Sequence, residues 1–182
     1  MNLIKTKLDG LVVLKPTVFK DNRGYFMESY NQKNINKLLG NVNFVQDNES
    51  ESSRGVLRGL HFQKPPYTQA KLVRCLKGSV LDVVLDLRKD SKTYGIFETI
   101  SLTEENKKQL FIPKGFAHGF IVLSKSAILS YKVDNYYNPE SESGIIWNDP
   151  DLNIDWKINK NEIIVSEKDK NLPAFNEIIN PF

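Results

Sequence analysis

The two histidines of the chain are the side chains best suited to move a proton at neutral pH. His61 lies in "GLHFQ", close in sequence to Arg58 and Lys71, and His118 lies in "GFAHGF". Burial and nearby positive charge both favour the neutral ring, which is the form that acts as a base. A histidine in an apolar strand is more often a packed structural residue, so the local sequence leaves both interpretations open for each ring.

Other kinds of chemistry have little support. Two histidines cannot make a three-histidine metal site, and neither lies in an H-x-H or H-E-x-x-H motif. The chain lacks the G-x-S-x-G motif of serine hydrolases and the glycine-rich loops that bind phosphates. Cys75 is the only cysteine, and it lies among apolar residues where a thiol is usually inert. We therefore expect general acid–base chemistry, with no metal and no cofactor.

Further polar residues have ordinary interpretations when they are taken one at a time. Tyr131 is on the apolar side of its segment, so a packed ring with a bonded hydroxyl is the default. Asp169, in "VSEKDK", has the sequence context of a surface acid, and "QDNESESS" (residues 46–53) predicts a polar loop. The same patterns favour exposed loop charges at Arg23, Glu28 and Glu142.

Short apolar segments with turn signals between them make up most of the chain. Turns are indicated by Lys77-Gly78 and by Pro113-Lys114-Gly115. The best helix signal is residues 31–40, which end at a glycine, and residues 102–110 have the charge pattern of a single helical turn. Many short strands at this rhythm predict an all-β sandwich or barrel. The predicted strands are 11–19, 71–76, 79–87, 97–102, 109–113, 119–123 and 127–133.

The predicted strand 79–87, "SVLDVVLDL", has two different faces. Side chains alternate across a strand, so one face is formed by leucines and Val83 and is expected to pack on a core. The other face carries Asp82 and Asp86 between valines. It fits either the partly polar interior of a ligand-holding barrel or a solvated sheet face, and this strand alone favours the solvated face.

The composition is that of a single globular domain spanning residues 1–182. Hydrophobic residues make up 40% of the chain and charged residues 26%, which argues against disorder. The net charge of +3 is too small for a nucleic-acid-binding protein, although a few arginines can still bind a local anion. Neither a secretory signal nor an apolar segment long enough to cross a membrane is evident, which predicts a soluble cytoplasmic protein.

A set of segments, in order and at characteristic spacing, resembles the dTDP-4-dehydrorhamnose 3,5-epimerase family. The resemblance covers about residues 4–169 and implies a cupin-like double-stranded β-helix, or jelly roll, with a few short peripheral helices. It also implies a homodimer in which an N-terminal segment of one subunit helps to line the site of the other. The segments are "FKDNRGYFMESYN", "FVQDNES", "GVLRGLHFQ", "KLVRCLKGSVLDVVLDLRKDS", "IPKGFAHGF", "YKVDNYYNP", "GIIWNDPDLNIDW" and "VSEKD".

The resemblance implies an isomerase that inverts C3 and C5 of a dTDP-linked 4-keto-6-deoxyhexose in dTDP-L-rhamnose biosynthesis. His61 is then the base, Tyr131 the proton donor, Asp169 the partner that orients His61, and Lys71 the group that stabilises an enolate. Substrate-binding positions are implied at Arg23, Glu28, Gln46, Asp47, Asn48, Arg58, His118, Tyr137, Glu142 and Lys168. Among these, the arginines suit phosphate oxygens and Tyr137 suits stacking on the thymine base.

Other functions remain open at this point. Within the same family, one alternative is an epimerase that inverts C3 alone, and another is an epimerase that acts on a different nucleotide-linked ketosugar. A jelly-roll carbohydrate-binding module without turnover is a candidate from a different class. A metal-dependent cupin oxygenase is disfavoured because the chain has only two histidines.

Overall fold

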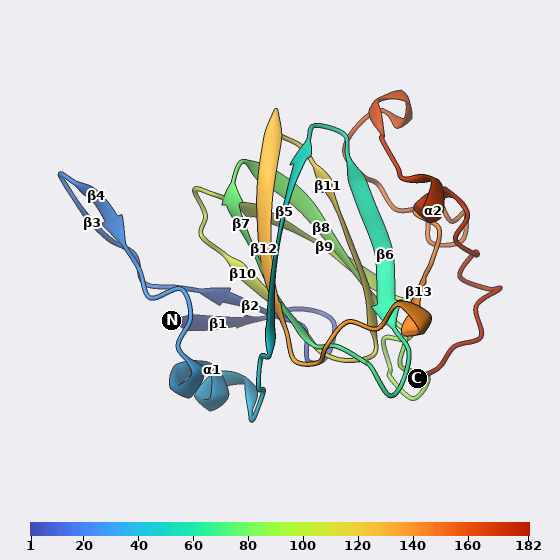
Figure 1. Ribbon diagram of the computed structural model, residues 1–182, viewed down its shortest axis with the longest axis horizontal. Helices are drawn as coiled ribbons and strands as arrows, with labels where there is room; N and C mark the ends of the chain where they lie inside the picture. The colour runs from blue at the N-terminus through green and yellow to red at the C-terminus, as the bar shows by residue number, and fades with distance from the viewer.

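The computed structural model describes all residues, Met1–Phe182, and shows two antiparallel sheets that face each other (Figure 1). The six-stranded sheet consists, in spatial order, of β1 (Asn2–Lys5), β2 (Val12–Lys15), β10 (Gln109–Ile112), β7 (Lys71–Lys77), β12 (Ser126–Val133) and β5 (Gln46–Ser53). The five-stranded sheet consists of β13 (Glu142–Gly144), β6 (Leu57–Gln63), β11 (Phe116–Val122), β8 (Ser79–Asp86) and β9 (Phe97–Thr103). This all-β sandwich confirms the predicted jelly-roll class.

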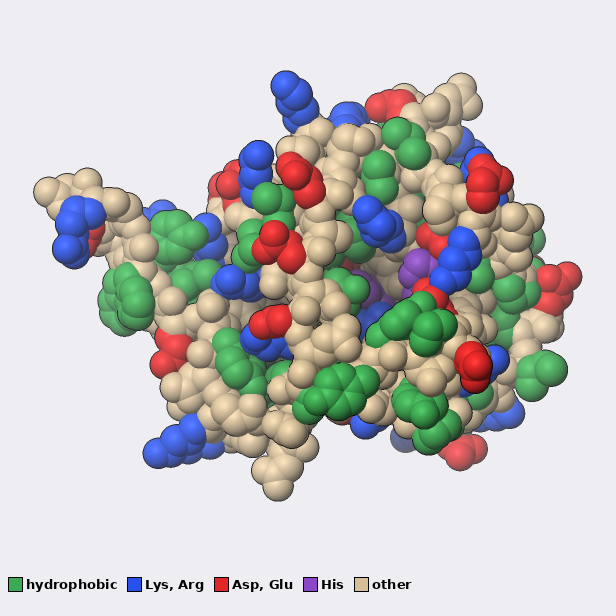
Figure 2. Space-filling view, viewed as in Figure 1, with side chains coloured by type: hydrophobic (Ala, Val, Ile, Leu, Met, Phe, Trp, Pro, Cys, Tyr) green, Lys and Arg blue, Asp and Glu red, His purple; other side chains and the backbone are tan.

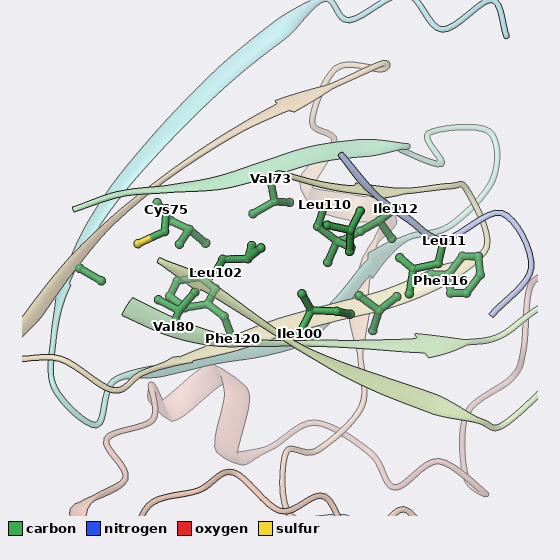
Figure 3. Close-up of a cluster of buried hydrophobic side chains, with 14 of the residues drawn as sticks. Leu11, Val73, Cys75, Val80, Ile100, Leu102, Leu110, Ile112, Phe116 and Phe120 are labelled. Carbon is green, nitrogen blue, oxygen red and sulfur yellow. The ribbon is translucent and has the colours of Figure 1, made fainter. Parts of the chain in front are cut away.

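Strand β8 is buried on both faces, so the prediction of a solvated face is wrong. Val80 and Val84 belong to the core between the two sheets, where Figure 3 shows Val80 near Phe120 and Leu102 of the neighbouring strands. Leu81 and Leu85 point the other way, into a second core that the C-terminal part of the chain covers with Trp156 and its neighbours. Burial on both faces explains why the strand has almost no exposed residue.

Strand β5 corrects the prediction of a loop over "QDNESESS". It is an edge strand, and all eight of its residues pair with β12, from Gln46 opposite Val133 to Ser53 opposite Ser126. Local composition is a poor guide at an edge, because one face and one side of the strand meet solvent and polar side chains protect against pairing with other chains. The pairing with β12 decides the conformation here.

Helical structure is short and peripheral. Helix α1 (Gln32–Leu39) confirms the predicted helix: Asn31 caps its start, Ile35 is its buried anchor, and Gly40 ends it with a positive φ of 81°. Residues 104–106 form a turn after β9 rather than a helical turn. The remaining short elements are α2 (Glu167–Lys170) and the 3-10 helices η1 (Pro139–Ser141) and η2 (Lys160–Glu162). No helix of the chain has the length and apolar character needed to span a bilayer.

A small hairpin of β3 (Phe19–Asp21) and β4 (Gly24–Phe26) projects from the body of the molecule (Figure 1). It pairs only with itself, and all six of its strand residues are exposed. None of its strand residues belongs to the hydrophobic core, and Tyr25 contacts the body through Lys107, whose Nζ donates a hydrogen bond to the Tyr25 hydroxyl at 2.9 Å.

Candidate active site

A cavity of about 540 Å³ opens between the sheets, next to a smaller one of about 230 Å³. His61, Lys71 and Tyr131 line both cavities, so these three side chains lie where the two meet. Figure 2 shows the two histidine side chains in a hollow on this face of the molecule. His61 is on β6 of one sheet, whereas Lys71 and Tyr131 are on β7 and β12 of the other.

His61 is held by a buried carboxylate. Its Nε2 lies 2.8 Å from Oδ1 of Asp169, and Oδ2 of the same carboxylate accepts a hydrogen bond from the backbone N–H of Gly59 at 3.2 Å. Burial would raise the pKa of Asp169, but the bonds from His61, Gly59 and Ser166 together lower it, so the carboxylate is ionised. An ionised carboxylate only accepts, so Nε2 carries the proton and Nδ1 of His61 is left for a ligand.

Asp169 is therefore not the surface acid that its local sequence indicated. It is buried in α2, whose N-cap Ser166 accepts a hydrogen bond from the backbone N–H of Asp169 at 3.1 Å. The "SEKD" pattern of residues 166–169 is a capping-box signal, and it was available in the sequence as a sign that Ser166 starts a helix. Nothing local indicates that the helix packs against β6.

His118 has a carboxylate partner of its own. Strands β6 and β11 place His118 opposite His61, and Nε2 of His118 lies 2.9 Å and 3.0 Å from the two carboxylate oxygens of Asp82. Both side chains are buried, and His118 lies within strand β11. Close approach of the two strands requires glycine: a Cβ on Gly59 would lie 2.4 Å from the Cα of Gly119.

Lys71 and Tyr131 present free polar atoms to the cavity. Neither Lys71 Nζ nor Tyr131 Oη has a hydrogen-bond partner within the chain, yet no buried side-chain nitrogen or oxygen is left unpaired, so both atoms border accessible space. Burial lowers the pKa of Lys71 to about 8, against the opposing charges of Asp82 and Glu142. Burial also raises the pKa of Tyr131, so its phenol keeps its proton at neutral pH.

The smaller cavity is bordered by a polar cluster. Glu142 Oε2 accepts a hydrogen bond from the hydroxyl of Tyr137 and lies beside Lys168 Nζ, each at 2.5 Å. Burial raises the pKa of Glu142, but the contacts with Lys168 and Tyr137 outweigh this and lower it. Gln46 and Asn48 line the same cavity and are bonded to each other at 2.9 Å.

Arg58 and Asp47 differ in their position relative to the cavities. Arg58 lines the larger cavity, where its guanidinium donates to Ser52 Oγ at 3.2 Å. Asp47 lies between Gln46 and Asn48 on β5, so its side chain points to the opposite face, where it pairs with Lys132 at 2.5 Å. The structure therefore does not bring Asp47 to the cavity.

Arg23 and Glu28 are also remote from the cavity of their own chain. The side chain of Arg23 is 85% exposed and pairs with Asp21 of the same hairpin at 2.6 Å. Glu28 accepts hydrogen bonds from Asn31 and Asn34 near the start of α1. Neither residue lines the two cavities described above.

Several lining residues were absent from the sequence prediction. Most are apolar, two are glutamines, and none has a local sequence pattern that indicates a site. Only the tertiary structure brings them together. Those of the larger cavity include Ser50, Val56, Leu57, Phe120, Leu129 and Ile164, and those of the smaller include Gln63 and Gln69. No group of three His, Cys, Asp or Glu side chains is arranged to hold a metal ion.

Comparisons with known proteins identify a matching family model and similar proteins. The family model described as dTDP-4-dehydrorhamnose 3,5-epimerase matches residues 5–177. The dTDP-4-dehydrorhamnose 3,5-epimerase of Escherichia coli is 51% identical over 180 residues, which are 98% of this chain and 97% of the relative. The crystal structure of the corresponding protein of Elizabethkingia anophelis is 55% identical, has a TM-score of 0.94, and is covered over 98% of its length by 99% of this chain.

A second solved structure was determined with a sugar nucleotide bound. It is the dTDP-6-deoxy-D-glucose-3,5-epimerase of Legionella pneumophila in complex with dTDP-4-keto-L-rhamnose, at 47% identity and a TM-score of 0.93 over 97% of this chain and 94% of that one. The resemblance inferred from the sequence is confirmed by the family model and by these relatives. The chain belongs to the dTDP-4-dehydrorhamnose 3,5-epimerase family.

Proposed function

We propose that the chain is an isomerase that inverts C3 and C5 of dTDP-4-dehydro-6-deoxy-D-glucose to give dTDP-4-dehydro-L-rhamnose. The observation that carries the proposal is the origin of the reactive groups in opposite sheets. His61 comes from β6 and Tyr131 from β12, so a sugar ring held between the sheets has a base on one side and a proton donor on the other. Relatives of high identity and coverage carry the name of this activity.

The chemistry follows from the ketone at C4 of the substrate, which acidifies the protons on C3 and C5. Nδ1 of His61 removes one of these protons, and the electron pair of the broken C–H bond moves to the ketone oxygen as an enolate. The ammonium of Lys71 stabilises that oxygen, because it is a preorganised positive charge in a partly dry site. Tyr131 then donates its proton to the opposite face of the carbon, which inverts the centre.

Asp169 keeps His61 productive by bonding to Nε2, which fixes the tautomer and the orientation of the ring. For the nucleotide, Arg58 and Lys168 supply positive charge for the diphosphate, and Tyr137 offers an exposed ring for the thymine base. The remaining polar groups of the two cavities, Gln46, Asn48, His118 and Glu142, are assigned to hydrogen bonds with the same ligand.

We further propose that the active form is a homodimer in the cytoplasm. The hairpin of β3 and β4 carries Arg23 away from its own cavity, and Glu28 lies nearby, so a partner subunit is the means by which these residues reach a site. Phe19 and Phe26 leave large apolar rings exposed on the hairpin, which a partner would cover. The single cysteine, buried and without a disulfide partner, fits a reducing compartment.

Incubation with the substrate in D₂O tests the reaction. Deuterium at both C3 and C5, with a product of inverted configuration, is the expected result. Label at C3 alone identifies a 3-epimerase. Turnover of another nucleotide-linked ketosugar, without turnover of this one, identifies an epimerase with a different substrate. Binding of the nucleotide sugar without any exchange identifies a carbohydrate-binding module and contradicts the proposed isomerase.

A further inference from the structure

Two buried aspartates lie on the inner face of β8, and only Asp82 is bonded to a residue that lines the active-site cavity. Asp82 and Asp86 are both fully buried, at 0% exposure. Asp86 is satisfied by its own neighbours: it pairs with Arg88 at 2.7 Å and accepts hydrogen bonds from the hydroxyls of Ser91 and Thr93. Asp82 has one hydrogen-bonded partner, His118.

The pair of His118 and Asp82 repeats the arrangement of His61 and Asp169. In both pairs a carboxylate lies within 3.0 Å of Nε2, and the two histidines are register partners on β6 and β11. Nδ1 of His118 has no partner within the chain, yet no buried side-chain nitrogen is left unpaired, so this atom borders the cavity. Two imidazoles therefore present Nδ1 to one ligand.

The negative charge of Asp82 also affects the protonation of Lys71. Lys71 is drawn toward its neutral form by burial and toward its charged form by Asp82 and Glu142. Glu142 is already engaged with Lys168 and Tyr137, and Asp169 with His61. The other charged or titratable groups that line the cavity are Arg58, His118 and Tyr131. Of Asp82, Glu142 and Asp169, only Asp82 has an exposure of 0%, and its one hydrogen-bonded partner is His118.

We propose that Asp82 is a positioning residue of the proposed epimerase, because its carboxylate holds the ring of His118 with Nδ1 facing the bound sugar. The negative charge of Asp82 also favours the ammonium form of Lys71. The inference rests on the proposed function, and it assigns to Asp82 a role that goes beyond packing. Asp82 acts through His118 and Lys71 and does not itself touch the sugar.

Asp82→Asn is the direct test, because asparagine has the same shape without the charge. Removal of the charge makes Lys71 easier to deprotonate, so the alkaline decline of kcat moves to lower pH by about one unit. We expect kcat at pH 7 to fall about 10-fold to 100-fold, the usual cost of losing a group that orients a reactive residue. Affinity for dTDP, measured by calorimetry, stays within about twofold of the wild type.

Asp86→Asn is the matched control, since it removes an equally buried carboxylate from the same face of the same strand. It is expected to lower Tm yet leave the alkaline decline of kcat where the wild type has it. If Asp82→Asn changes only Tm and keeps the wild-type pH profile, Asp82 is a structural residue and the inference is overturned. The double variant His118→Asn/Asp82→Asn, compared with His118→Asn alone, separates the two effects of Asp82. Without the imidazole of His118, Asp82 can act only on the charge of Lys71, so any further change in the pH profile reports that effect.

The wild-type protein provides a test that does not depend on the folding of any variant. With two histidines in the chain, ¹⁵N NMR of the rings is simple to assign, and His118 is expected to carry its proton on Nε2. A neutral ring protonated on Nδ1 would contradict the proposed orientation. Absence of sugar-proton exchange in the wild type refutes the proposed function instead, and the NMR result still decides the orientation of His118.

Discussion

The cavity between the sheets and the hairpin of β3 and β4 are built in opposite ways. In the cavity, each reactive side chain comes from a strand with neighbours on both sides or is bonded to one, as Asp169 is bonded to His61. In the hairpin, Phe19 and Phe26 are 63% and 69% exposed, and Arg23 pairs only with Asp21. Both regions hold residues that the family resemblance implies for the site.

The difference between the two regions indicates which steps of the proposed function need only one chain and which need a second copy. Strand register places the proposed base, proton donor and ammonium group in the cavity of a single chain, so the proposed proton transfer depends on the jelly-roll barrel that the two sheets form, called the barrel below. Arg23 does not line either of the two cavities of its own chain. In the proposed homodimer, its contribution to binding would therefore be made in the site of the second copy. Changes in the barrel are therefore expected to lower kcat, and changes in the hairpin to raise KM.

The largest effect is expected for His61→Asn. Loss of the base lowers kcat by about 10³-fold to 10⁴-fold and abolishes deuterium uptake at both carbons, since general acid–base catalysis contributes on this scale. Affinity for dTDP, measured by calorimetry, is expected to be retained because His61 does not bind the nucleotide. Residual exchange at one carbon near the wild-type rate would contradict a single base for both centres.

Lys71→Met is expected to lower kcat by about 10²-fold to 10³-fold, the scale found when one group that stabilises an oxyanion is removed. Tm is expected to stay level or rise, because methionine fills the space without the cost of burying an ammonium group. Lys77→Met, at the exposed other end of β7, is the control and should leave kcat unchanged. Measurement of both variants by steady-state kinetics and calorimetry separates charge from packing.

The pH dependence of the wild type sharpens the role of Lys71. Its pKa in the folded protein is about 8, below the ordinary value, so kcat is expected to fall as pH rises through about 8. The free energy of unfolding changes with pH in the opposite direction from kcat. Above pH 8 the unfolded chain binds more protons at Lys71 than the folded chain does. This residue therefore makes the free energy of unfolding increase with pH up to its unfolded pKa. Lys71→Met should remove that increase in urea titrations.

Tyr131→Phe is expected to lower formation of the fully inverted product by about 10²-fold, while His61 continues to exchange protons. Deuterium uptake without inversion at one carbon is the specific signature. Tyr136→Phe, on an exposed neighbouring ring, serves as the control. Loss of exchange together with loss of product would assign Tyr131 to binding rather than to proton donation.

Arg23→Ala should have the smallest effect, a rise in KM of about tenfold with kcat within about twofold of the wild type. One charge-assisted hydrogen bond to a phosphate accounts for this magnitude. Lys157→Ala, which removes an exposed cation paired within its own loop, is the control. If Arg23→Ala lowers kcat as strongly as the barrel variants do, the contrast between the two regions is wrong.

A mixture of two impaired chains tests whether the hairpin works in the partner. His61→Asn chains retain an intact hairpin, and chains with residues 19–26 replaced by a short glycine linker retain an intact barrel. Each mixed dimer then contains one complete site of two, and random mixing of equal amounts makes about half of the dimers mixed. At substrate concentrations below KM, mixing is therefore expected to restore activity toward about a quarter of the wild-type value. Without restoration, although size-exclusion chromatography shows mixed dimers, the hairpin does not act across the interface.

Strong local patterns made several elements predictable. Strand β8 and helix α1 were predicted within about a residue of their observed bounds, because apolar runs and a capped, glycine-ended helix are signals carried by neighbouring residues. The family resemblance supplied the roles of the candidate site residues, and the structure brings most of them to the two cavities. Those roles remain predictions that the experiments above test.

Other features depend on segments that are distant in sequence. Strand β5 exists because β12 offers it a partner, and "QDNESESS" has no β signal of its own. Asp169 is buried because α2 packs on β6, more than 100 residues earlier in the chain. The polar face of β8 became an interior face because the six-stranded sheet covers it, while the C-terminal part of the chain covers the opposite, leucine-bearing face.

The sequence by itself determined the class of fold, the kind of chemistry and the family, because each of these is written in residue types and in their order along the chain. Tertiary structure alone decided which carboxylate meets which histidine, that His61 and Tyr131 line one cavity from opposite sheets, and that Arg23 lies outside that cavity. The physical reason is that burial and hydrogen bonding are properties of neighbours in space, and pairing between distant strands chooses those neighbours.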